Sequence, residues 1–235
     1  SDIFEFNDNE EKILDWKIPS TDNDPIGQVG ISVISKEKSD GSIILNYLTF
    51  YGEANQIFRR PKHIEEYKRG VDSKDGYYGQ IWRNAWVQAL DKWEERGKNF
   101  RICQNIGRGI IYTGTEVWKN YSISSKITFQ SVSSGGLVAR VQGVKRYYTF
   151  ELNSDNTLCI GKMFYDYKVL KKVDFNLEFF REYSLKMEIQ NNKIKGYVDD
   201  RLILEVEDND NFIKNGGSGL TVSDGTLVSE EVKIN

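Results

Sequence analysis

The chain of 235 residues contains 39% hydrophobic, 13% aromatic and 29% charged residues, a composition that excludes an intrinsically disordered protein and permits a packed core. Its formal net charge of −3 arises from 32 basic and 35 acidic residues that are interspersed, so we expect no nucleic acid partner. No apolar run approaches the roughly 20 residues that span a bilayer, and we expect no membrane partner either.

The chain begins with Ser1 rather than Met, which suggests a piece of a longer protein. Its length exceeds the roughly 100–150 residues of a typical domain, so two units are favoured but not required. We expect three parts: an N-terminal β segment over residues 1–60, a linker and helix over residues 61–98, and a β-sandwich over residues 99–235.

The N-terminal segment has the pattern of a β-hairpin. Apolar and polar positions alternate over residues 29–35 and again over residues 42–50, and the turn signal Ser-Asp-Gly stands between them at residues 39–41. Two strands are not stable alone, so this segment must pack on another part of the chain or of its parent.

Residues 61–98 are predicted to form a polar linker followed by one amphipathic helix. Over residues 77–96, apolar side chains recur at helical spacing, and Gly97 supplies a stop signal. The apolar stripe consists of Ile81, Trp82, Ala85, Trp86, Ala89, Leu90 and Trp93. Such an aromatic face could stack on sugars, but docking between two β units is the favoured interpretation. The only histidine, His63, lies in the linker and leaves no imidazole pair for zinc.

From residue 99 onward, short alternating runs are separated by turn residues. Each run places its apolar side chains on one side, as Leu137, Ala139 and Val141 do. The runs cover residues 121–129, 137–141, 148–152, 158–160, 183–189, 194–198, 202–206, 219–223 and 228–234. About nine strands, each with one apolar face, predict an all-β fold in which two antiparallel sheets pack as a sandwich or jelly roll.

The two cysteines, Cys103 and Cys159, lie within strand-like sequence. Lone cysteines in such positions are usually small buried hydrophobic residues, so we expect free thiols. The localisation stays open, with the free thiols pointing towards the cytoplasm.

Three stretches carry a resemblance to known proteins: WKNYSISSKI at residues 118–127, GLVARVQG at 136–143 and RYYTFEL at 146–152. They resemble the concanavalin A-like sandwich of laminin-G-type and related sugar-binding modules, which implies a lectin-like β-sandwich over residues 99–235. Together with CQNIGRG at residues 103–109, they resemble more closely the C-terminal accessory region of bacterial ADP-ribosylglycohydrolase-family proteins.

In that family region the sandwich follows a jelly roll similar to galactose-binding domains, and residues 26–31 and 47–52 resemble its closing strands. Because such a domain needs roughly 130 residues, this unit would be truncated or abbreviated. The acidic, metal-binding helical core of these hydrolases has no counterpart in the sequence. The resemblance therefore implies a noncatalytic accessory module that binds carbohydrate or an ADP-ribose-like ligand beside the catalytic domain of a parent chain.

The hairpin of residues 137–142 and 147–152 offers the best candidate ligand-binding face. If a loop of residues 143–146 joins the strands, Gln142 lies opposite Tyr147. By the same register, Arg140 lies opposite Thr149. The side chains predicted to share the face opposite the core are Arg140, Gln142, Tyr147, Thr149 and Glu151. Their donors, acceptors and stacking surface suit a sugar or ribose phosphate, although a solvated face with a surface ion pair is the alternative.

Two other functions stay open. One is a structural or oligomerisation module whose helix and sheet faces are buried against neighbours. The other is a sandwich-fold glycoside hydrolase, because Glu205 and Glu207 lie two residues apart and retaining hydrolysis needs two carboxyl groups roughly 5–5.5 Å apart. No cofactor is expected, although the acidic turns at residues 153–156, 199–200 and 208–211 could supply oxygen ligands for calcium.

Overall fold

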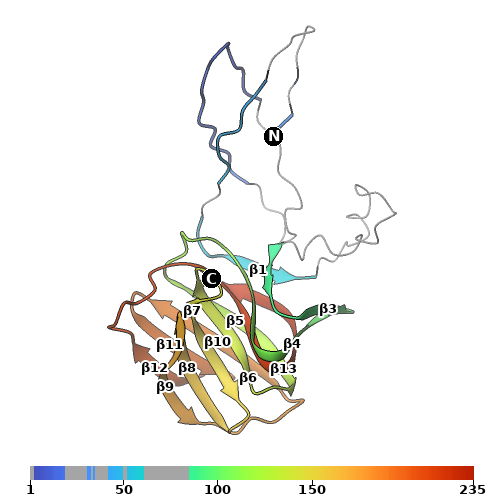
Figure 1. Ribbon diagram of the computed structural model, residues 1–235, viewed down its shortest axis with the longest axis vertical. Coiled ribbons are helices and arrows are strands. Elements are labelled where there is room, and N and C mark those ends of the chain that lie inside the picture. Colours follow the sequence, from blue (N-terminus) through green and yellow to red (C-terminus); the bar gives the residue numbers. More distant parts are fainter. Residues whose placement is uncertain (1–2, 19–30, 33, 35–41, 50–51, 61–84) are drawn as a thin grey trace.

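The computed structural model describes residues 3–18, 31–32, 34, 42–49, 52–60 and 85–235. These residues form an all-β structure, which confirms the predicted fold class (Figure 1). The strands are β1 (Gln56–Arg59), β2 (Val87–Ala89), β3 (Lys92–Arg96), β4 (Asn99–Thr113), β5 (Tyr121–Ser131), β6 (Ser134–Val141), β7 (Arg146–Asn153), β8 (Thr157–Phe164), β9 (Asp166–Asp174), β10 (Glu182–Gln190), β11 (Lys193–Val198), β12 (Arg201–Glu207) and β13 (Gly217–Ile234). Within the described ranges, no helix is long and apolar enough to cross a membrane.

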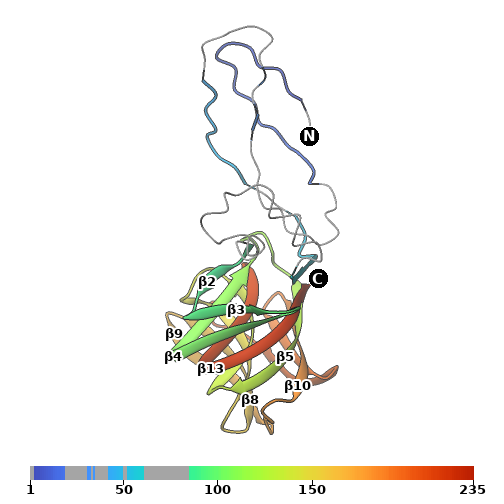
Figure 2. The ribbon, with the colours of Figure 1, turned by 90° about the vertical axis from the view of Figure 1, so that its right-hand side faces the viewer.

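The strands belong to one hydrogen-bonded sheet that folds over itself into two layers (Figures 1 and 2). Its order is β12-β11-β10-β5-β13-β6-β7-β8-β9, and β4 runs along β13. The long strand β13 joins the layers, because its first part pairs with β6 and its last part with β5. The strand is irregular between Ser223 and Gly225, where a Cβ atom on Gly225 would lie 1.7 Å from the Ser131 carbonyl oxygen. Only glycine fits this bend.

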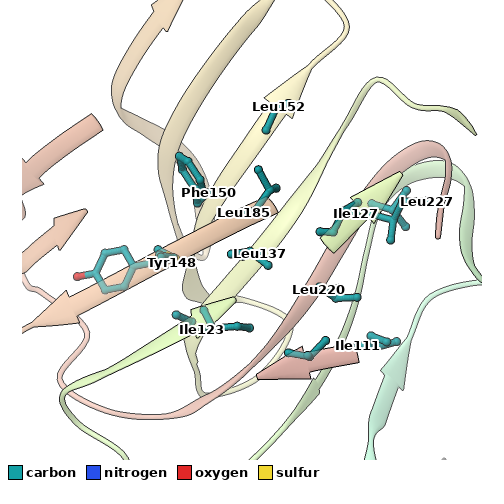
Figure 3. Close-up of a cluster of buried hydrophobic side chains, with 14 of the residues drawn as sticks. Ile111, Ile123, Ile127, Leu137, Tyr148, Phe150, Leu152, Leu185, Leu220 and Leu227 are labelled. Atoms are coloured by element: carbon teal, nitrogen blue, oxygen red, sulfur yellow. The ribbon is translucent and has the colours of Figure 1, made fainter. Parts of the chain in front are cut away.

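Apolar side chains from the inner faces of both layers fill the space between them (Figure 3). Ile123 and Ile127 of β5 face this core, as do Leu137 of β6 and Phe150 of β7, and all four are fully buried. Opposite Phe150, on β11, Gly196 lies so close to the ring that a Cβ atom would stand 2.2 Å from it. The predicted alternation of strands 121–129 and 148–152 is therefore confirmed, because burying one face of each strand is what holds the layers together.

The helix predicted over residues 77–96 is wrong in its described part, residues 85–96. These residues form β2 and β3, which pair one after the other with β4. Trp86 and Trp93 lie in the core, with ring centroids 5.9 Å apart, and Trp93 also packs at 5.9 Å from Phe100. A spacing of seven residues suits one face of a helix, but the break between the two strands places both rings on the same side as well. The backbone hydrogen bonds of β4 decided between these structures, and a local pattern does not show them.

The hairpin predicted over residues 29–50 lies partly outside the described residues. The described residues 42–49 are exposed and belong to no strand, so the predicted second strand is not present there. Further along, β1 pairs with the end of β13, with Phe58 opposite Val232. Part of the N-terminal segment thus extends the sandwich, while the division of the chain into three parts stays a prediction.

Candidate functional site

The hairpin formed by β6 and β7 has a different register from the predicted one. Val138 pairs with Thr149, and the regular pairing ends where Ala139 lies opposite Tyr148. Arg140 follows in the left-handed region with φ of 50°, an unusual conformation for a residue other than glycine. The irregularity at Arg140 turns its side chain to the core side, whereas Val141 packs in a separate apolar cluster on the outer face. The predictions that Arg140 shares the outer face and that Val141 shares the core face are therefore wrong.

Arg140 is 1% exposed and is surrounded by main-chain oxygens. Its guanidinium donates to the carbonyls of Lys119 at 2.9 Å, Asn191 at 2.6 Å and Ile213 at 2.6 Å. Its Nη2 also donates to Oδ1 of Asn120 at 3.3 Å. Burial lowers the pKa of Arg140. These contacts tie three loops to the sheet and leave the side chain no free surface for a ligand.

Gln142 also contacts the loop between β12 and β13 (residues 208–216). Its Nε2 donates to the carbonyl of Asn215 at 3.0 Å and to Oδ1 of the same residue at 2.6 Å. Arg140 and Gln142 thus hold this loop from the β6–β7 hairpin. The structure does not bring them together with Tyr147, Thr149 and Glu151, and the ligand-binding role predicted for the five residues stays a prediction.

The main-chain N–H of Arg140 donates to the Tyr121 hydroxyl at 2.6 Å, and burial raises the pKa of Tyr121 to about 12. Because the folded protein holds this phenol neutral, its contribution to stability is complete below the unfolded value of about 10 and is lost as the pH rises towards 12. We expect this residue to account for roughly 2–3 kcal/mol of alkaline destabilisation. Urea denaturation at several pH values would show that the free energy of unfolding falls less steeply with rising pH for Tyr121→Phe than for the wild type. Equal slopes would contradict the role given to Tyr121.

Tyr147, Thr149 and Glu151 do share the outer face, as predicted, and the structure adds two partners. Glu151 is fully buried and forms an ion pair with Arg108 of β4. The Tyr167 hydroxyl of β9 donates to Oε2 of Glu151 at 2.7 Å and lies 3.1 Å from Thr149 Oγ1. The Arg108 guanidinium stacks over the Tyr167 ring, 4.2 Å from its centroid. This outer-face network (Arg108, Glu151 and Tyr167) satisfies both carboxylate oxygens of Glu151 within the chain.

Electrostatics within the outer-face network favour a neutral Tyr167 and a charged Arg108. Burial, followed by the negative charge of Glu151, raises the pKa of Tyr167. For Arg108, burial lowers the pKa, but the attraction of Glu151 and Tyr167 outweighs it, so the net shift is upward. Burial and the same carboxylate raise the pKa of the Cys159 thiol, which is a free cysteine as expected. The sequence prediction missed Arg108 and Tyr167 because it assigned no strand to residues 99–113 or 166–174. Neither segment alternates regularly in burial, and in β9 every third residue is partly buried.

A hollow of about 220 Å³ lies at the edge of the sandwich, where β8 and β9 of one layer meet the β12–β13 loop of the other. Its walls carry an aromatic ring, carboxylates, an amide and two lysines. The lining residues are Lys162, Phe164, Asp166, Lys168, Leu170, Asp208, Asp210 and Asn211. The acidic turn at residues 208–211 was noted in the sequence, but nothing local placed it beside Phe164.

The β8–β9 turn presents two aromatic rings to solvent beside this hollow. Phe164 is 36% and Tyr165 59% exposed, and the rings meet edge to face with centroids 5.6 Å apart. Tyr165 has φ of 66°, a conformation that costs a bulky residue about 1–2 kcal/mol. Arg146 holds both rings, 4.9 Å from the Phe164 centroid and 5.4 Å from the Tyr165 centroid. Phe164 and Tyr165 therefore form an aromatic surface beside the hollow that is open to solvent.

Glu205 and Glu207, the candidate carboxylates of a glycoside hydrolase, lie on β12 and pair with lysines of β11. Lys193 Nζ lies 2.9 Å from Glu205 and 4.0 Å from Glu207, and Lys195 lies 3.7 Å from Glu205. The hydrogen bond from Lys193 lowers the pKa of Glu205, the opposite of the shift that a general acid needs. Both carboxylates have the partners of a solvated sheet face.

The acidic turns proposed as calcium ligands do not gather into one cluster. In the part of the chain that the structure describes, no group of three or more His, Cys, Asp or Glu side chains is placed to hold a metal ion. Calcium binding stays a prediction.

No protein-family model matches the sequence, and no curated protein sequence matches it. Among solved structures, the carbohydrate-binding module CBM66 from Bacillus subtilis is similar, with a TM-score of 0.57 and 21% identity over 64% of this chain and 95% of that one. A protein of unknown function with a galectin-like fold, also from Bacillus subtilis, has a TM-score of 0.53 and 10% identity over 76% of this chain and 94% of its own. The potassium-bound carbohydrate recognition domain of Emp46p has a TM-score of 0.51 and 10% identity over 75% of this chain and 95% of its own.

These similarities confirm the predicted concanavalin-like sandwich and add that the fold is galectin-like. At such low identity they establish the fold alone, because one fold can carry many functions.

Proposed function

We propose that this chain is a noncatalytic carbohydrate-binding module and that its binding site is the hollow beside Phe164. The observation that carries the proposal is an exposed aromatic ring on the wall of a hollow whose other walls bear carboxylate, amide and ammonium groups. The fold supports it, since two of the similar solved structures are named as a carbohydrate-binding module and a carbohydrate recognition domain.

The chemistry of a sugar ring suits these walls. Its C–H face is apolar and packs on an aromatic ring, which Phe164 offers at the mouth of the hollow. Its hydroxyls both donate and accept, so the carboxylates of Asp166 and Asp210 accept and the amide of Asn211 can do either. The hollow, at about 220 Å³, is smaller than the roughly 300–1,000 Å³ pockets of larger ligands and suits a single sugar ring.

An ADP-ribose-like ligand is the finer form of the proposal. Lys168 lines the hollow, Lys145 lies in the neighbouring β6–β7 loop and Arg146 begins β7, so that all three could balance a pyrophosphate charge. A catalytic domain in the parent chain would then receive substrate concentrated by this module. Binding of neutral sugars without binding of ADP-ribose would contradict this finer proposal but not the proposal of a carbohydrate-binding module.

Replacing Phe164 with alanine tests the site. We expect affinity for a bound glycan to fall at least tenfold, about 1.4 kcal/mol, because the stacking surface is lost. A glycan and nucleotide panel read by melting temperature would identify the ligand, and isothermal titration calorimetry would then compare the variants. Phe179→Ala is the matched control, since Phe179 is also exposed but lies beyond the other end of β9.

Equal affinities of Phe164→Ala and the wild type would move the site elsewhere. The outer face, on which Tyr147 is only 2% exposed, is then the next site to test, and Tyr147→Phe removes only a hydroxyl from it. If no glycan or nucleotide raises the melting temperature, a structural or oligomerisation module is favoured, and its mass in solution would depend on concentration. Release of reducing sugar that stops in Glu205→Gln would favour the hydrolase instead.

A further inference from the structure

The ammonium group of Lys162, one of the residues that line the hollow, lies among three oxygen atoms of the β12–β13 loop. Its Nζ is 2.7 Å from Asp208 Oδ2 and 3.0 Å from the carbonyl oxygen of Asn211. It also donates to the carbonyl oxygen of Asp210. The residue is only 6% exposed, although it belongs to β8, in the opposite layer from β12.

The arrangement of these oxygens resembles a cation site. One carboxylate and two main-chain carbonyls from a short acidic turn are the ligand types that calcium takes in proteins. The turn is also folded on itself, because the Asp210 N–H donates to Asp208 Oδ1 at 3.2 Å. The acidic composition of residues 208–211 suggested calcium from the sequence, yet the point where the oxygens converge holds the ammonium of Lys162.

Lys162 also connects the loop to the rest of the hollow. Asp208 Oδ2 accepts a second hydrogen bond, from the buried Tyr148 hydroxyl, at 2.6 Å. The Lys162 ammonium lies 5.4 Å from the centroid of the Phe164 ring. All three N–H donors of the ammonium have an acceptor, so the group is fixed in place and links β8 to the β12–β13 loop.

We infer that Lys162 is a built-in cation that replaces a metal ion in the β12–β13 loop. The loop is then held in its binding conformation without calcium, and ligand binding in the hollow is insensitive to chelators. The statement about ligand binding rests on the proposed function, whereas the statement about the loop does not.

The test compares the wild type with Lys162→Ala, and with Lys168→Ala as a matched control that removes a lysine from the same hollow. Melting temperature is measured with EDTA and with millimolar Ca²⁺, and Tb³⁺ luminescence sensitised by aromatic side chains reports a bound ion. We expect the wild type and Lys168→Ala to respond to neither ion. Lys162→Ala should melt at a lower temperature in EDTA, recover part of the loss in Ca²⁺ and acquire Tb³⁺ luminescence.

Two results would overturn the inference. One is a wild type that Ca²⁺ stabilises as much as it stabilises Lys162→Ala, and the other is a folded Lys162→Ala without any response to Ca²⁺ or Tb³⁺. If Lys162→Ala does not fold in EDTA, both this variant and Lys162→Gln are refolded in Ca²⁺. Failure of Ca²⁺ to restore either variant would contradict the inference that a metal ion can take the place of the lysine. These measurements need no sugar, so a failure of the proposed function would leave their outcome readable.

Discussion

Replacing Glu151 with glutamine is expected to lower the free energy of unfolding by about 3–5 kcal/mol, because it leaves a largely buried arginine without its charge partner. Glu151 is fully buried, and the side chain of its partner Arg108 is only 19% exposed. The amide would also turn a donor towards either Arg108 or the Tyr167 hydroxyl, where the carboxylate accepts from both. Urea denaturation followed by tryptophan fluorescence measures the change.

Glu205→Gln provides the matched control for this prediction. It removes the same charge from an ion pair with Lys193, 2.9 Å away, in which both side chains are exposed to solvent. Exposed pairs contribute about 0–1 kcal/mol, so the control should scarcely change the unfolding midpoint. If Glu151→Gln were as mild as Glu205→Gln, the outer-face network would contribute nothing to the fold and a binding role for that face would gain support.

Replacing Arg140 with methionine should lower the free energy of unfolding by at least about 3 kcal/mol. Its guanidinium donates to three main-chain carbonyls, and each buried acceptor left without a donor costs about 1–3 kcal/mol. Lysine cannot replace it, because one ammonium on a flexible stem does not reproduce the planar set of donors. Thermal and urea unfolding of Arg140→Met and Arg140→Lys would both show the loss.

Arg146→Met distinguishes a structural from a binding role within the same hairpin. Arg146 contacts the exposed rings of Phe164 and Tyr165, so its replacement should weaken ligand binding and change stability by less than about 1 kcal/mol. Arg140→Met should do the reverse, with unchanged affinity in the folded fraction. An Arg140→Met protein of normal stability that lost its ligand would restore the sequence-based assignment of that residue.

The wrong sequence-based placement of Arg140 has a simple origin. The five residues predicted as a ligand face depend on strict alternation along β6, and the irregularity at Arg140 breaks it. Before this position Val138 lies on the outer face as expected, whereas after it Val141 packs in the outer apolar cluster instead of the core. A single residue in the left-handed region therefore separates Arg140 and Gln142 from the three side chains that stayed together.

The alternating pattern of residues 121–234 determined the class of fold and most of the core, because a strand in a sandwich must bury one face and alternation records which one. Local pattern could not distinguish the strands at Trp86 and Trp93 from a helix, since only pairing with β4 makes them strands. The hollow was equally inaccessible, because it joins residues 162–170 of one layer to residues 208–211 of the other. Lys162 and Asp208 meet only when the layers close, and such contacts between distant segments leave no periodic trace in the sequence.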